Sequence, residues 1–153
     1  MEIRTAKRIR RTGAILFLLY ILVLAYLMFF FEAYDRNMAD RHYLYNLVPF
    51  REIRRFIMYR ETLGFSAVAG NLIGNVVGFV PFGYILPILY KKRRNWRDIV
   101  LLTMELSLLI EIIQLVLRVG CCDIDDIILN TFGGWLGYIL FYICNIIRRK
   151  VDG

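Results

Sequence analysis

Four long apolar stretches alternate with polar segments along the chain. The stretches cover about residues 14–31, 71–90, 98–117 and 127–147. Each is close to the ~20 residues that an α-helix needs to cross ~30 Å of hydrocarbon. Because backbone N–H and C=O groups inside lipid must pair within their own segment, helices are the expected form. The pattern predicts an all-α integral membrane protein, a bundle of four transmembrane helices in a single domain over residues 1–153.

A shorter amphipathic segment lies between the first two stretches, at about residues 49–63. Pro49 suits the start of a helix, and Gly64 suits its end. At helical spacing its apolar side chains fall largely on one side, and Arg51, Arg54 and Arg55 gather on another. The pattern predicts a short interfacial helix in the headgroup region. Its arginines either reach the phosphates of the surrounding lipid or form a rim that attracts an anionic headgroup.

Composition and charge add an orientation to this picture. Hydrophobic residues make up 59% of the chain, and its net charge is +7. Thirteen of the twenty Lys and Arg residues lie before residue 12, at 91–97 and at 148–150. Four spans place these three regions on one side, and the positive-inside rule predicts that this side is the cytoplasm, with both termini there. The charge indicates contact with anionic membrane lipids, and no motif accompanies it that would indicate a nucleic-acid partner.

Polar residues inside or beside the apolar stretches are the main candidates for a site, because such groups are costly at membrane depth. In the predicted topology, three helices bring them to one level, the extracytoplasmic third of the bilayer. We expect the binding residues to be Asn71 and Asn75 in the second span, Gln114 and Arg118 in the third, and Asp123, Asp125 and Asn130 at the start of the fourth, together with Arg51, Arg54 and Arg55 of the interfacial helix. Two further acidic residues, Glu111 and Asp126, are the candidates for catalysis.

The spacing of these residues puts each set on one helix face. Glu111, Gln114 and Arg118 fall at i, i+3 and i+7. Asn71 and Asn75 are four residues apart, and so are Asp126 and Asn130. The simpler interpretation is that these groups only pair across helices and hold the bundle together. Glu105 lies deeper in the membrane and on another side of its helix. We expect Glu105 to be a structural partner for other polar groups within the bundle.

Glycines supply the predicted helix contacts. Gly70, Gly74 and Gly78 form a small-residue ladder in the second span, and Gly133 and Gly137 repeat the spacing in the fourth. Such residues allow helix backbones to approach closely in lipid.

Few chemistries fit these residue types. Carboxylate and amide oxygens suit Mg²⁺ or Ca²⁺, but no spacing matches a known metal motif, so no metal or other cofactor is assigned. Two carboxyl groups in unlike surroundings can serve as acid and base, and Arg118 can hold an anion. His42 is the only histidine, so a serine triad is not expected.

An ordered set of short motifs resembles the VanZ-like family. The motifs are Asn46-Leu47-Val48-Pro49-Phe50; Asn71 and Asn75 followed by Phe79, Pro81, Gly83, Leu86 and Pro87; Glu111, Gln114 and Arg118; and Asp123, Asp125, Asp126, Asn130, Thr131, Gly133 and Gly137. The resemblance covers about residues 44–142. It implies a small bacterial membrane protein of the cell envelope, since the family's founding member is associated with teicoplanin resistance.

The resemblance implies a compartment and a phenotype and leaves two classes of function open. The first is a non-catalytic protein that binds a lipid, a lipid-linked cell-wall precursor or a lipoglycopeptide in an outward-facing polar cavity. The second is a membrane-embedded hydrolase or transferase that acts on a lipid-linked or headgroup substrate through its acidic residues. We favour binding, because the chain lacks a histidine base and a metal motif, and we leave the oligomeric state open.

Overall fold

Four long helices dominate the structure and confirm the predicted transmembrane bundle. The computed structural model describes residues 2–34, 44–90, 94–119 and 121–151. Within these ranges the long helices are α1 (Glu2–Tyr34), α4 (Phe65–Leu89), α5 (Trp96–Leu117) and α6 (Ile124–Val151). Each is long and apolar enough to cross a membrane. All four begin before the predicted spans, because a helix does not end where its apolar stretch ends; in α1 the added residues include several arginines, which are good helix formers.

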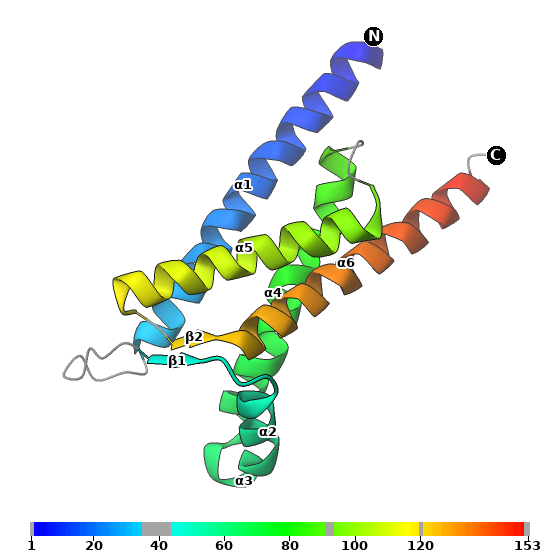
Figure 1. Ribbon diagram of the computed structural model, residues 1–153. Helices are drawn as coiled ribbons and strands as arrows, with labels where there is room; N and C mark the ends of the chain where they lie inside the picture. The colour runs from blue at the N-terminus through cyan, green and yellow to red at the C-terminus, as the bar shows by residue number, and fades with distance from the viewer. Residues whose placement is uncertain (1, 35–43, 91–93, 120, 152–153) are drawn as a thin grey trace.

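The helices are arranged around α4 and α6, which pack closely along much of their length (Figure 1). The next closest neighbour of α6 is α5, and α1 packs against α4 and α5. Leu24, Phe79 and Ile110 form one buried apolar cluster between α1, α4 and α5. The two ends of the chain lie at the same end of the bundle, as four crossings require (Figure 1).

Glycines make the contact between α4 and α6 possible. A Cβ atom built on Gly133 would lie 2.1 Å from the Val76 carbonyl oxygen, and one built on Gly137 would lie 2.1 Å from that of Val80. Gly83 is in similarly close contact with Gly134. Side chains at these positions would hold the two backbones apart, so the glycines determine the distance between the helices.

Two glycines of the ladder predicted for the second span do not face α6. A Cβ atom on Gly74 would meet nothing within 4 Å, and one on Gly78 would only touch a Leu24 side chain at 3.4 Å. The face of α4 that meets α6 is therefore the one that contains Val76, Val80 and Gly83. Three glycines at four-residue spacing indicated a helix contact but could not show which face of the helix makes it.

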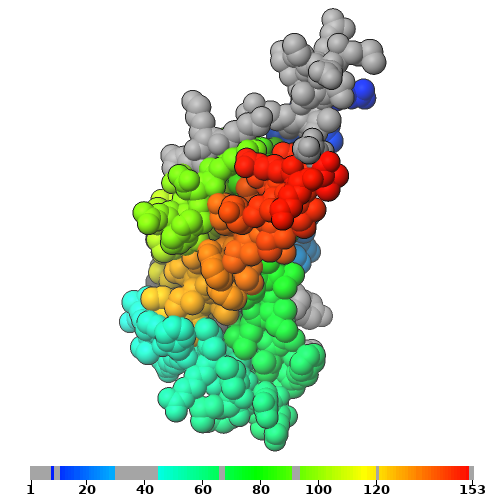
Figure 2. Space-filling view, turned by 90° about the vertical axis from the view of Figure 1, so that its right-hand side faces the viewer, coloured from blue at the N-terminus to red at the C-terminus, as the bar shows by residue number. Residues whose placement is uncertain are grey.

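The predicted interfacial helix is present but is divided in two. α2 (Arg51–Met58) is followed by α3 (Arg60–Leu63), and Tyr59 separates them with backbone angles of −101° and 20°. Gly64 has a φ of 83°, in the region that favours glycine, and α4 begins at the next residue. Both short helices lie at the end of the bundle opposite the C-terminal end of α6, as the cyan and green surface in Figure 2 shows.

A small parallel sheet, which the sequence did not predict, joins two distant segments of the chain at this end of the bundle. β1 (Leu44–Asn46) pairs with β2 (Cys121–Asp123), so that Tyr45 lies beside Cys122 and Asn46 beside Asp123. β2 leads directly into α6. The pairing fixes the segment before α2 against the start of α6, and this is where the polar residues meet.

Candidate functional site

A chain of acidic residues connects α5, β2 and α6 at the end of the bundle away from the termini. Glu111 on α5 is 2% exposed, and its Oε2 accepts a hydrogen bond from the Asp123 backbone N–H at 2.9 Å. Asp123 Oδ1 in turn accepts the Asp125 N–H at 2.8 Å and the Asn46 side-chain Nδ2–H at 3.1 Å. Asp123 therefore caps the first turn of α6, and Glu111 holds the strand that leads into it.

Asp125 extends this chain to α2. Its Oδ1 accepts the Phe50 N–H at 2.5 Å, and its Oδ2 accepts those of Glu52 at 2.8 Å and Ile53 at 3.1 Å. Phe50 has a left-handed φ of 64° and provides no side-chain cap for α2. A buried carboxylate from α6 thus satisfies the free N–H groups of another helix and complements the positive end of its dipole. This contact fixes the position of α2 relative to the bundle.

A second set of polar contacts links α4, α5 and α6 to one another. Asp126 Oδ1 accepts a hydrogen bond from Asn75 Nδ2 at 2.6 Å. Deeper in the bundle, Asn130 Nδ2 donates to Ser107 Oγ at 2.8 Å. On α5, Gln114 Nε2 donates to the Met28 carbonyl oxygen of α1 at 2.9 Å. These pairs match the simpler interpretation of the sequence, in which polar side chains hold helices together.

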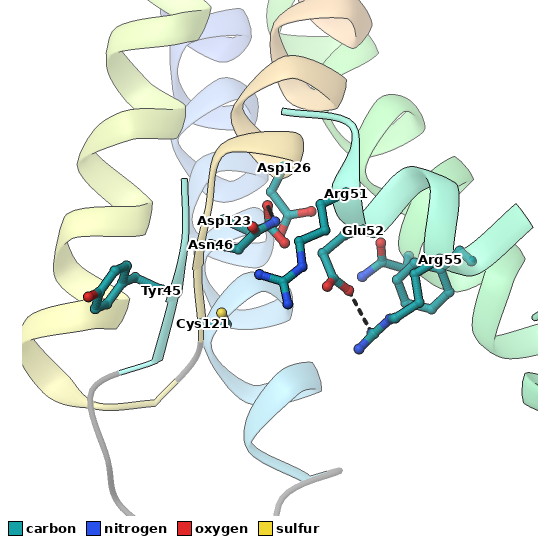
Figure 3. Close-up of a pocket in the computed structure, with 10 residues that line it drawn as sticks. Tyr45, Asn46, Arg51, Glu52, Arg55, Cys121, Asp123 and Asp126 are labelled. Atoms are coloured by element: carbon teal, nitrogen blue, oxygen red, sulfur yellow. Dashed lines mark hydrogen bonds and ion pairs between the residues drawn. The ribbon is translucent and has the colours of Figure 1, made fainter. Parts of the chain in front are cut away.

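A pocket of about 300 Å³ opens beside the acidic chain. Polar and charged side chains from α2, α4, β1, β2 and α6 line most of it, and Figure 3 shows Arg51 reaching toward the group formed by Asn46, Asp123 and Asp126. The lining residues are Tyr45, Asn46, Arg51, Glu52, Arg55, Phe56, Asn71, Cys121, Asp123 and Asp126. Segments from four separate parts of the sequence therefore meet in one cavity.

The two arginines of the pocket have different surroundings. Arg55 forms an ion pair with Glu52 at 2.6 Å and lies over the Phe56 ring, 5.1 Å from its centroid. The Arg51 guanidinium makes no hydrogen bond or ion pair with any other residue of the described ranges. Arg51 is thus a cation at the pocket with its donors available, and the ion pair with Glu52 partly neutralises Arg55.

Burial raises the pKa of two neighbouring groups of β2, one of which, Asp123, lines the pocket. Removal from water raises the pKa of the Asp123 carboxyl above its ordinary value, and the nearby Asp125 and Glu52 charges add to this rise. The hydrogen bonds from the Asp125 N–H and from Asn46 oppose it. Burial also raises the pKa of the Cys122 thiol, and the charges of Glu111 and Asp123 act in the same direction. Asp123 therefore holds a proton more readily than an exposed carboxyl group does.

The structure separates the residues predicted for the site into three groups. Arg51, Arg55, Asn71, Asp123 and Asp126 line the pocket. Asn75, Glu111 and Asp125 do not line it, but each forms a hydrogen bond with a residue of the lining. The side chains of Gln114 and Asn130 are engaged between helices outside the lining, and Arg54 is an exposed residue of α2 that does not line the pocket either.

Arg118 departs from the predicted stripe for a local reason. α5 ends at Leu117, and Arg118 follows with a left-handed φ of 57° and an exposed side chain. The i, i+3, i+7 pattern holds only while the helix continues, so Glu111 and Gln114 share a buried face that Arg118 leaves. Arg118 is not among the residues of the pocket.

Sequence reasoning missed half of the pocket lining. Tyr45, Asn46, Glu52, Phe56 and Cys121 were not predicted. Asn46 and Tyr45 enter through the β1–β2 pairing, which has no local signal in the sequence, although Asn46 begins the Asn46–Phe50 motif. Glu52 could have been found as the i, i+3 partner of Arg55.

The described ranges contain no group of three or more His, Cys, Asp or Glu side chains arranged to hold a metal ion. Most oxygen atoms of the acidic chain already accept backbone or amide hydrogen bonds. The geometry is therefore that of an anchored scaffold beside a polar pocket.

Comparison with known proteins agrees with the motifs. The family model described as VanZ/LLP1 matches residues 17–145. Protein VanZ from Enterococcus faecium is 33% identical over 138 residues, which are 88% of this chain and 77% of that protein. No solved structure matches the chain significantly. With its four apolar helices this is a bacterial multi-pass membrane protein, and the chain belongs to the VanZ/LLP1 family.

Proposed function

We propose that the pocket binds the anionic polar part of an amphiphilic molecule at the outer surface of the membrane, and that this binding contributes to glycopeptide resistance of the teicoplanin type. The molecule is a membrane lipid, a lipid-linked cell-wall precursor or a lipoglycopeptide. The observation that carries the proposal is the Arg51 guanidinium, which lines the pocket without a charged partner among the described residues.

The position of Arg51 supports this choice of ligand. Arg51 is the first residue of α2, the helix that Asp125 anchors to the bundle through three backbone hydrogen bonds. An anchored guanidinium presents a planar set of donors that fits phosphate and carboxylate oxygens. Because the helix is held before a ligand arrives, binding needs little reordering of the protein.

The surroundings of the pocket suit a ligand that also has an apolar part. Tyr45, Leu47, Val48 and Phe50 follow each other along the segment from β1 to α2, and each is more than half exposed. Exposed apolar side chains beside a polar pocket are expected where a protein meets the boundary between headgroups and acyl chains. A ligand with its anionic group at Arg51 can therefore keep its apolar part in the membrane.

The alternative of a membrane-embedded enzyme has one specific observation in its favour. Asp123 and Asp126 line the same pocket, and burial raises the pKa of Asp123 above its ordinary value. Two carboxyl groups with different proton affinities can divide the roles of acid and base. In that case Asp123, and not Glu111, would act beside Asp126, because Glu111 does not line the pocket.

The test expresses the protein in a susceptible Gram-positive host and compares the inhibitory concentrations of teicoplanin and vancomycin. Arg51→Ala removes the available cation, and Arg54→Ala is its matched control, since it removes an arginine of the same helix outside the pocket. We expect wild type and Arg54→Ala to protect against teicoplanin and Arg51→Ala to protect much less. Immunoblots of membrane fractions check that all variants accumulate equally.

A binding measurement separates the ligand from the phenotype. Native mass spectrometry of the purified protein should show anionic amphiphiles that remain bound to wild type and to Arg54→Ala. Their binding to Arg51→Ala should be about tenfold weaker or more, since a charge-assisted hydrogen bond is lost. Equal binding to all three proteins would contradict the proposal. Binding that is lost in Arg51→Ala, without any protection by wild type, would contradict the role in resistance and leave the ligand assignment in place.

The same system decides between binding and catalysis. Protection that survives the Asp123→Asn and Asp126→Asn changes at normal expression would exclude the enzyme. Loss of protection in these variants, together with a chemically altered lipid or precursor that accumulates only with wild type, would exclude simple binding.

A further inference from the structure

α5 carries an acidic residue, Glu105, on the side that faces away from the bundle. The buried residues of this helix face the bundle, and two of them, Thr103 and Ser107, contact α6. At 100° per residue, Glu105 lies about 200° from Thr103, almost opposite the buried side, and its side chain is exposed. Glu105 was expected to be a structural partner within the bundle, but its side chain has no such contact in the described part of the chain.

This position is costly for a single copy in a membrane. Glu105 is near the middle of α5, about 14 Å along the axis from its first residue and about 18 Å from its last at 1.5 Å per residue. A glutamate side chain is too short to reach either interface from there, as a lysine or arginine near a helix end can. The Glu105 side chain makes no hydrogen bond or ion pair with any other residue of the described ranges. A polar group outside the described ranges is thus needed to satisfy it, and a second copy of the chain can supply one.

The residues around Glu105 indicate what kind of partner fits. Leu101, Leu108 and Ile112 are exposed on the same side of α5 as Glu105. The four positions are separated by four, three and four residues, which is the spacing of the seam between two helices packed side by side in a coiled coil. A single polar residue in such a seam fixes the register and the number of helices.

We propose that α5 is the dimerisation helix of this protein, and that Glu105 pairs with Glu105 of a second copy across the Leu101–Ile112 seam. Two copies inserted in the same orientation and related by a twofold axis along the membrane normal bring their α5 helices together in parallel. The symmetry then places each residue opposite its own counterpart at equal depth. A helix of another protein would need a polar group that matches this depth by coincidence of sequence.

The two carboxyl groups satisfy each other when at least one of them carries a proton. Its O–H donates a hydrogen bond to an oxygen of the other group, and no pair of like charges is left in the lipid. The contact lies on α5 away from the pocket, so the dimer does not depend on the proposed function.

Disulfide cross-linking in native membranes tests the contact. In a full-length protein whose three cysteines are replaced by alanine, Leu108→Cys places a thiol on the seam. Val77→Cys is the matched control, because Val77 is also exposed and lies in the middle of α4. With a membrane-permeable oxidant, we expect a covalent dimer from Leu108→Cys and none above background from Val77→Cys. Equal yields from the two variants, or no dimer from Leu108→Cys, would overturn the proposal.

Energy transfer between labelled copies in proteoliposomes measures the contribution of Glu105. We expect Glu105→Leu to dimerise about tenfold more weakly, and Glu105→Gln to recover dimerisation because an amide can pair across the seam. Glu105→Leu changes no side-chain contact within one copy of the chain, so the thermal unfolding of the diluted monomer should match wild type. Unchanged dimerisation of Glu105→Leu overturns the role of Glu105. A cross-link from Leu108→Cys to a different protein, with no self-association, overturns the choice of partner.

Discussion

At the scale of single residues, the acidic side chains have unequal roles although they are close in sequence. Asp123 caps α6, Asp125 caps α2, and Asp126 holds Asn75 of α4. Only Asp123 and Asp126 also line the pocket. A buried carboxylate that accepts several backbone N–H bonds is a structural element, and its removal leaves those donors unsatisfied. The four-residue segment from 123 to 126 therefore combines the anchoring of helices with the lining of a cavity.

Among the acidic residues, Asp125 should contribute most to the stability of α2, because it accepts three backbone hydrogen bonds at the start of this helix. We expect Asp125→Ala to lower the free energy of unfolding by about 2 kcal/mol, since a helix cap contributes up to that amount and a buried acceptor is lost. The local consequence is faster exchange of the amide hydrogens of Phe50, Glu52 and Ile53. Hydrogen–deuterium exchange with mass spectrometry on the purified protein measures it. Glu61→Ala, which removes an exposed acidic residue of α3, should leave exchange in α2 as in wild type; unchanged exchange in Asp125→Ala would show that the cap does not hold the helix.

At the scale of elements, the hydrophobic pattern of the sequence determines where the helices lie along the chain. The fit between helix surfaces determines which of their faces meet. Apolar length predicted four spans, and proline and glycine marked the segment that contains α2 and α3, because both signals act within one stretch of chain. The contact between α4 and α6 depends instead on which glycine meets a neighbouring carbonyl oxygen. Gly133 and Gly137 were recognised, whereas Gly83 was not included among the packing glycines, and Gly74 of the predicted ladder meets no other helix among the described residues. Spacing alone does not define the orientation of a helix whose every side is apolar.

The glycine contacts lead to a pair of opposite expectations. Gly133→Ala places a methyl group against the Val76 carbonyl oxygen, which belongs to backbone and cannot move aside, so the helices must separate. We expect a loss of about 1–3 kcal/mol in the free energy of unfolding. Gly74→Ala meets nothing within 4 Å and should be neutral or stabilising by about 0.5–1 kcal/mol through helix propensity. The free energies of unfolding of both variants are measured in the same detergent. Equal changes in the two variants would refute the contact between α4 and α6 at Gly133.

The candidate site shows the same division between local and non-local information. Asn71, Asp123 and Asp126 could be predicted, because polar groups at membrane depth are rare and their level follows from the topology. Asn46 and Cys121 could not, because they come together through a strand pairing between residues 75 or more apart in sequence. Arg118 was misplaced because a periodic pattern does not show where a helix ends.

At the scale of the whole molecule, one orientation in the membrane underlies the proposed function. The pocket and the α2–α3 segment lie at the end of the bundle away from both chain ends (Figure 1). The exposed final turn of α6 carries Arg148, Arg149 and Lys150. Basic residues beside a span remain in the cytoplasm, since their transfer across the membrane is disfavoured. We therefore expect this turn to lie inside and the pocket to face the cell surface, where envelope lipids and glycopeptides are found.

Two exposed positions at opposite ends of the bundle test this orientation. In the cysteine-free protein, Glu61→Cys places a thiol on α3 and Arg149→Cys places one in the last turn of α6. A membrane-impermeant maleimide should label Glu61→Cys in intact cells and Arg149→Cys only after permeabilisation. Both side chains are exposed, so a difference between them reports the side of the membrane and not local burial. If Arg149→Cys is labelled in intact cells and Glu61→Cys is not, the pocket faces the cytoplasm, and binding of a surface molecule can no longer explain how the protein acts.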